Sequence, residues 1–190
     1  MKMFNKSLGI LAGLALLLTF AGAGTAGAAS PTRIDADVDA ALERFYQQTS
    51  DGKRVVQEAK GVLVFPVVVK AGFIFGGEYG EGALRIGGRT VDYYSTAAGS
   101  FGFQIGAQKK TIILLFMQDE VLDRLRQTSN WKAGADASIA VITLGAGGSV
   151  DSQKTNEPII AFITDQKGLM YNLTLEGTKF TKLDKSDYRK

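Results

Sequence analysis

The stretch at residues 61–82, GVLVFPVVVKAGFIFGGEYGEG, constrains the fold more than any other part of the sequence. Its first half is almost entirely β-branched or aromatic, which favours a well-covered strand over a helix. Pro66 cannot donate a ladder hydrogen bond, so we expect a bulge, a bend or an edge position there. Glycines follow at 76, 77, 80 and 82. Glycines this dense inside strands favour a sharply curved sheet first, and direct contact with a ligand second.

The N-terminal residues have the pattern of a targeting segment. Lys2 and Lys6 precede an apolar run at residues 8–20 and then a small-residue tract, AGAGTAGAA, with A-x-A-like cleavage sites. This run is shorter than the ~20 residues that a spanning helix needs. We therefore expect a signal peptide at residues 1–29 and a single domain at residues 30–190, exported and periplasmic or peripherally associated with the envelope membrane. The chain has no cysteine, which excludes lipoprotein acylation and disulfide bonds.

The rest of the chain predicts a mixed fold. Helices are predicted over residues 32–49, with an acidic polar face, and over 54–60 and 119–127. Strands are predicted over residues 62–69, 73–79, 83–86, 90–95, 100–108, 111–117, 135–144, 158–164, 168–175 and 178–183. The strand at 111–117 is apolar on both faces and should be central. This order predicts an α+β domain with antiparallel, strongly curved, barrel-like sheets, N-terminal helices and one inserted helix.

Composition excludes most catalytic chemistry. Without histidine or cysteine the chain cannot build Ser-His-Asp or Cys-His sites, thiol redox centres or the usual zinc and haem ligand sets. No carboxylate pair or phosphate loop stands out; Glu78 and Glu81 flank a predicted solvated turn. We therefore predict no enzymatic activity, no cofactor and no metal. A nucleic-acid partner is not expected either, because the domain lacks a strongly basic face.

Positive charge is concentrated in the centre of the chain. Residues 53–110 hold eight basic and four acidic side chains, a local charge of +4, whereas the chain without Lys2 and Lys6 carries 20 basic and 19 acidic residues. This segment could attract an anionic membrane surface or an acidic partner. An ordinary solvated mixture of charges explains it equally well.

Several blocks of sequence resemble a known family. Six runs closely resemble, in order, the SYLF domain of secreted bacterial proteins and some eukaryotic adaptors: AKGVLVFPVVVKAGFIFGGEYGEGAL, YYSTAAGSFGFQIGAQ, IILLFM, WKAGADASIAV, GAGGSV and GLMYNLTLEGTK. The resemblance covers roughly residues 55–181. The resemblance implies a phospholipid-binding domain; eukaryotic members are described as binding phosphoinositides and, in fungi, actin. Here the first helix is acidic rather than basic. We therefore expect anionic bacterial phospholipids as partners, and neither actin nor SH3 proteins.

The resemblance and the local charge together predict a binding site for a phospholipid headgroup. Its candidate residues are the basic side chains and glycines of the central segment: Lys60, Lys70, Gly76, Gly77, Gly80, Gly82, Arg85, Lys109 and Lys110. Lys70 could instead be an end-of-strand lysine that reaches water, and Lys109 and Lys110 the polar start of a strand. Tyr93, Tyr94 and Trp131 could lie at a lipid interface, although packing is the simpler interpretation. The sequence thus predicts a non-enzymatic lipid-binding envelope protein; the alternative is a small integral outer-membrane β-barrel or a structural envelope protein.

Overall fold

The computed structural model describes residues 29–72, 75–101, 106–143, 157–168 and 175–185. The predicted signal peptide, apart from Ala29, and most of the strand predicted at 168–175 lie outside these residues. The elements run in the order α2 (Pro31–Gln48), α3 (Gly52–Glu58), β1 (Gly61–Gly72), β2 (Phe75–Ile86), β3 (Arg89–Phe101), β4 (Gly106–Phe116), α4 (Asp119–Gln127), β5 (Asn130–Lys132), β6 (Ile139–Thr143), β7 (Ile159–Gly168) and β8 (Lys179–Leu183).

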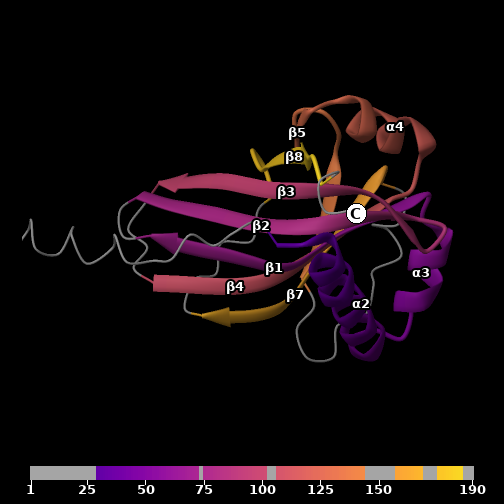
Figure 1. Cartoon of the computed structure of the whole chain (residues 1–190), viewed down its shortest axis with the longest axis horizontal. Helices are drawn as coiled ribbons and strands as arrows, with labels where there is room; N and C mark the ends of the chain where they lie inside the picture. Colours follow the sequence, from indigo (N-terminus) through magenta and orange to yellow (C-terminus); the bar gives the residue numbers. More distant parts are fainter. Residues whose placement is uncertain (1–28, 73–74, 102–105, 144–156, 169–174, 186–190) are drawn as a thin grey trace, which may run out of the picture.

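The strands form a single sheet in the order β5-β8-β3-β2-β1-β4-β7-β6. It is strongly curled into a half barrel (Figure 1), which confirms the predicted α+β class with a curved, barrel-like sheet. One part of the prediction is wrong, because β6 and β7 pair in parallel and the sheet is therefore mixed. The segment that joins these two strands is long enough for the crossover that parallel pairing requires, whereas the other paired strands are antiparallel.

Apolar side chains cover both faces of the central strands. On one face, Leu63 and Phe65 of β1 join residues of β4, α4 and β7 and the buried Trp131. On the other face, Val62 and Val64 pack with α2 and α3. Figure 1 shows α2 and α3 on one side of the sheet and α4 on the other. We name these the α2 face and the α4 face. Burial on both sides confirms that the strand predicted at 111–117 is central.

A bulge in β1 reverses which residues point to which face. The register of β1 against β2 shifts between Val64 and Val67, and against β4 between Phe65 and Val68. Before the bulge Phe65 belongs to the α4-face cluster, and after it Val68 does, three residues later. The hydroxyl of Thr111 donates a 2.9 Å hydrogen bond to the carbonyl of Pro66 inside the bulge. The bulge expected at this proline is confirmed.

A second bulge lies at the same level of the sheet. The pairing of β4 with β7 shifts register between Lys109 and Thr111, where Asp165 adopts a positive φ of 55°. Arg44 and Gln48 of α2 each donate a 2.8 Å hydrogen bond to the carboxylate of Asp165, which holds this conformation in place. Since bulges increase the local twist of a sheet, the two bulges beside Thr111 explain the strong curl.

Two glycine predictions need correction or refinement. The glycines do not interrupt the strand predicted at 73–79, because β2 runs without a break from Phe75 to Ile86. A Cβ at Gly80 would lie 2.7 Å from the carbonyl oxygen of Val67, and a Cβ at Gly82 would collide with the carbonyl oxygen of Val64. These two positions therefore require glycine for close packing of β2 on β1. A Cβ at Gly77 meets no atom within 4 Å.

Other boundaries differ from the sequence prediction as well. The strand predicted at 100–108 is divided, since β3 ends at Phe101 and β4 begins at Gly106. The strand predicted at 135–144 shortens to β6, and β5 was not predicted. Helix α4 has the predicted bounds. Tyr93, Tyr94 and Trp131 are 7%, 0% and 0% exposed, which supports packing over a lipid interface.

The acidic residues of α2 attach this helix to the sheet. The carboxylate of Asp35 accepts hydrogen bonds from the hydroxyls of Thr90 at 2.8 Å and Tyr93 at 2.9 Å, and Asp39 pairs with Arg85 at 2.6 Å. The acidic polar face predicted for this helix therefore serves in part to anchor it to the sheet. The outer parts of β1, β2, β3 and β4 extend beyond the helices (Figure 1) and carry the surfaces described next.

Candidate functional site

A basic cleft lies on the α2 face between helix α2 and strands β4 and β7. It has a volume of about 360 Å³. Its lining comprises Arg33, Asp37, Ala40, Arg44, Pro66, Val67, Lys109, Lys110, Thr111, Asp165 and Lys167. The side chain of Lys110 lies on the opposite face with Val68, and the remaining lysines and arginines still outnumber the acids. Positive charge concentrated in a concave site favours anionic ligands.

The charges of this basic cleft are only partly compensated. Arg33 pairs with Asp37 at 2.9 Å and Arg44 with Asp165 at 2.8 Å. Burial alone would raise the pKa of Asp165, but the hydrogen bonds from Arg44 and Gln48 and the positive charge of Arg44 outweigh it and hold that pKa below its usual value. This carboxylate therefore stays ionised and remains bound to Arg44 and Gln48 of α2.

Lys109 and Lys167 supply the uncompensated charge. They are direct neighbours across β4 and β7, both are exposed, and neither forms an ion pair within the described residues. Like charges placed opposite each other destabilise a sheet, and an anion between them would relieve that repulsion. This pair is the strongest electrostatic feature of the cleft.

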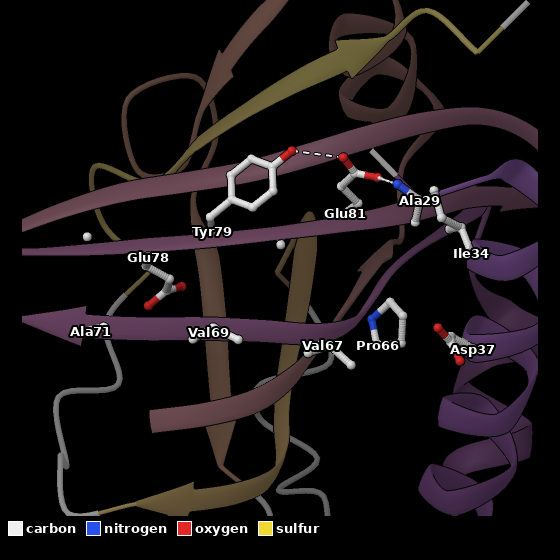
Figure 2. Close-up of a pocket in the computed structure, with 12 residues that line it drawn as sticks. Ala29, Ile34, Asp37, Pro66, Val67, Val69, Ala71, Glu78, Tyr79 and Glu81 are labelled. Atoms are coloured by element: carbon white, nitrogen blue, oxygen red, sulfur yellow. Dashed lines mark hydrogen bonds between the residues drawn. The ribbon is translucent and has the colours of Figure 1, made fainter. Parts of the chain in front are cut away.

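An exposed apolar surface adjoins the basic cleft on the same face. Val67, Val69, Phe75 and Tyr79 are 36%, 48%, 72% and 53% exposed. Three of them line a shallow hollow of about 660 Å³ between the N-terminus of α2 and the outer parts of β1 and β2 (Figure 2). The hollow and the basic cleft share Asp37, Pro66 and Val67, so they are continuous. Contiguous exposed apolar side chains of this kind mark protein or membrane contacts.

Glu81 closes one end of the hollow. Its carboxylate accepts hydrogen bonds from the backbone N–H of Ala29 at 3.1 Å and from the hydroxyl of Tyr79 at 2.9 Å (Figure 2). Lys185 donates to the same carboxylate at 3.2 Å and to the carbonyl of Ala29 at 2.9 Å. Burial, reinforced by the bond to Glu81, raises the pKa of Tyr79 to about 12, so its phenol stays neutral. These bonds fix the segment before α2 across the edge of the hollow.

The opposite face of the same strands is polar and closed to solvent. Lys70 is 6% exposed and Lys110 is 1% exposed, and Lys110 lies 2.9 Å from a carboxylate oxygen of Glu78 as an ion pair. Within the described residues the ammonium of Lys110 is buried and has no hydrogen-bond partner, so this contact is an ion pair alone. The side chain of Lys70 is therefore largely buried, and the small part that stays exposed is compatible with either interpretation of the sequence.

Comparisons with known proteins identify the family. The family model described as "Ysc84: Las17-binding protein actin regulator" matches residues 97–189. This is the SYLF family, which the blocks of sequence described above resemble. The chain carries a SYLF domain. A search of curated proteins found no match. The match begins in β3 and contains Lys109 and Lys167, whereas the SYLF-like blocks of β1 and β2 lie before it.

The nine candidate residues of this SYLF protein do not form one site. Lys60 lies at the start of β1, 3.9 Å from Asp119, and Arg85 lies beneath α2, paired with Asp39. Lys109 is on the α2 face and Lys110, its neighbour in sequence, is on the α4 face with Lys70. Two glycines line the hollow, Gly77 and Gly80, and only Gly77 has open space at its Cβ position. Gly76 lies where β2 meets the end of β1.

Sequence reasoning missed Arg33, Lys167 and the apolar strand surface of the SYLF domain. Lys167 becomes informative only when the register of β4 against β7 sets it beside Lys109. The apolar surface could have been found from Val67, Val69 and Tyr79, since alternation predicts that they share a face once the bulge is placed correctly. Within the described residues no group of acids could hold a metal ion, and no helix there has both the length and the apolar character needed to cross a bilayer.

Proposed function

We propose that this SYLF protein is a non-enzymatic, peripheral membrane protein of the bacterial envelope that binds anionic phospholipid through its α2 face. One observation carries the proposal: the unpaired lysines Lys109 and Lys167 line a cleft that is continuous with exposed apolar side chains of β1 and β2. A phospholipid presents the same combination, since its phosphate is anionic and its interfacial region accepts apolar side chains.

The geometry assigns separate roles to the two parts of the surface. Lys109 and Lys167 would contact headgroup phosphates, while Val69 and Phe75 would enter the boundary between headgroups and acyl chains. Each lysine near an anionic surface contributes about 1 kcal/mol, so the pair accounts for about 30-fold in affinity. The signal-like N-terminus at residues 1–29 supports an exported protein, which would meet phosphatidylglycerol and cardiolipin.

The test is co-sedimentation with vesicles, using protein purified from cells that express the full-length chain. Vesicles of phosphatidylcholine alone are compared with vesicles that contain phosphatidylglycerol, at low and moderate salt. We expect binding that rises with phosphatidylglycerol, falls with salt, and drops about 30-fold in Lys109→Ala/Lys167→Ala. The substitutions Val69→Ser and Phe75→Ser should weaken the binding that persists at higher salt.

A matched control comes from the other edge of the sheet. Lys132 and Lys179 are also exposed lysines paired directly across two strands, β5 and β8, and neither lines the cleft or the hollow. Lys132→Ala/Lys179→Ala removes the same charge and should bind vesicles as the unsubstituted protein does. Equal loss in the two double variants would show a general charge effect and refute the site. The description of the matching family names actin regulation, so actin filaments form a further arm, in which we expect no binding.

A further inference from the structure

A cluster of polar side chains is buried on the α4 face, opposite the proposed membrane surface. We name it the buried polar cluster; it consists of Lys70, Glu78, Thr96, Gln108 and Lys110, which are 6%, 9%, 0%, 3% and 1% exposed. Buried polar side chains are stable only when they are paired or hydrogen-bonded. This cluster therefore requires an explanation.

Strand register places Lys70 at the centre of the cluster. Lys70 is directly opposite Glu78 on β2 and Gln108 on β4. The neighbouring row across the sheet holds Val68 of β1 with Lys110 of β4. Rigid, paired strands thus hold these groups on one surface.

The cluster has one more positive charge than negative charge. Glu78 is committed to Lys110 at 2.9 Å, and Lys70 has no ion pair or hydrogen bond within the described residues. Burial of most of a charged side chain without a partner is unfavourable. A single negative charge beside Lys70 would neutralise the cluster.

The cluster also contains buried polar atoms that lack a hydrogen-bond partner. In the part of the chain that the structure describes, the second carboxylate oxygen of Glu78 and the amide oxygen of Gln108, on the two direct neighbours of Lys70, are buried without a hydrogen-bond partner. The hydroxyl of Thr96, two strands away in the row of Val68 and Gly80, is also buried without one. The ammonium of Lys70 and the hydroxyl of Thr96 can donate, whereas the two oxygens can only accept. A ligand here would carry oxygen acceptors for Lys70.

We propose that the buried polar cluster is a second ligand site, which takes one oxyanion group, a carboxylate or a phosphate, on Lys70. The site is distinct from the proposed membrane surface because it lies on the other face of β1 and β4. The oxyanion could belong to a free anion or to the head of a single-chain amphiphile. The apolar side chains that adjoin the cluster on the α4 face, Phe65, Val68 and Phe180, would suit the second source.

The test uses full-length protein titrated with sodium phosphate, sodium acetate and sodium octanoate at constant ionic strength, with thermal unfolding and fluorescence as readouts. Trp131, the only tryptophan of the chain, reports on the α4 face, because Trp131, Phe180 and Thr96 are successive partners across β5, β8 and β3. We expect saturable stabilisation by at least one of the anions. Lys70→Met should weaken it about tenfold or more, since a hydrogen bond to a charged group is lost.

Lys132→Met is the matched control, because Lys132 is an exposed lysine that lies outside the buried polar cluster and outside the basic cleft. It should bind the anion and the vesicles as the unsubstituted protein does, while Lys70→Met should weaken anion binding and leave vesicle binding unchanged. If Lys70→Met fails to fold, Gln108→Leu replaces it and should also weaken anion binding. Octanoate bound about tenfold more tightly than acetate would identify an amphiphile. Equal affinities would identify a free anion. No saturable effect, or an equal effect in Lys70→Met, would overturn the proposal and leave the membrane proposal untouched.

Discussion

Replacing Glu78 by glutamine tests the charge arrangement of the α4 face directly. Glutamine keeps the shape of glutamate but removes the charge, so two buried lysines, Lys70 and Lys110, would remain without the carboxylate that now faces them. Breaking a buried pair by removing one partner costs about 3–5 kcal/mol. For a chain of this size we expect the melting temperature to fall by about 10 °C.

The reciprocal substitution should cost less. In Lys110→Met the carboxylate of Glu78 loses its present partner, but Lys70 is its direct neighbour across β1 and β2 and can replace it. The structure therefore predicts an asymmetric pair of variants, with Glu78→Gln clearly more destabilised than Lys110→Met.

Urea unfolding at neutral pH, followed by circular dichroism and by Trp131 fluorescence, measures both variants. The double variant completes a thermodynamic cycle, whose coupling energy isolates the interaction between the two residues. A cost below about 1 kcal/mol for Glu78→Gln would refute the reasoning, because a surface pair has that value. Equal costs for the two single variants would refute the role assigned to Lys70.

Two further predictions concern the bulges and the curl of the sheet. Gly82→Ala should destabilise the protein by about 1–3 kcal/mol in urea unfolding, because its Cβ collides with the carbonyl of Val64, whereas Gly77→Ala should be tolerated; equal effects would contradict the packing argument. Asp165→Asn should destabilise the protein near neutral pH but not in acid, since a lowered folded-state pKa gives stability that is present above the unfolded value and lost as the pH falls through the folded one. Urea midpoints measured from pH 7 to below pH 3.8 test it, and a difference that does not shrink in acid would refute it.

Much of the fold could be predicted from local patterns. The helix over Asp119–Gln127 has acids in its first turn, basic residues near its end and apolar residues at helical spacing, so its bounds followed from sequence. The centre of the sheet followed from the doubly apolar strand that became β4. The proline in a β-branched run predicted a bulge, and the structure has one. These features depend on short-range rules.

Long-range features could not be predicted in the same way. The parallel pairing of β6 with β7 depends on a crossover, and no local pattern specifies it. The bulge at Asp165 is stabilised by Arg44 and Gln48, which are more than a hundred residues away in sequence. Lys167 was missed for this reason, because only the register across that bulge places it beside Lys109.

The grouping of Lys70, Lys109 and Lys110 into one site failed for a more specific reason. Successive residues of a strand point to opposite faces, so adjacent lysines cannot share a face of the sheet. Alternation also could not assign Lys70, because the face on which it lies depends on where the bulge at Pro66 inserts its extra residue. The residues were the expected ones, but their division between two faces requires the register.

The same division explains how one set of strands can carry two kinds of binding surface. Val69 and Lys109 are paired across β1 and β4 on the α2 face, and Lys70 and Gln108, one residue further along each strand, are paired on the α4 face. A one-residue slip of β1 would exchange these surfaces, exposing Lys70 and burying Val69. Thr111 opposes that slip, because its hydroxyl bonds to Pro66 in one bulge at 2.9 Å and lies 3.2 Å from Asp165 in the other. The bulges therefore do more than curl the sheet: they keep the lysines proposed for lipid on the outside and the lysine proposed for the oxyanion inside.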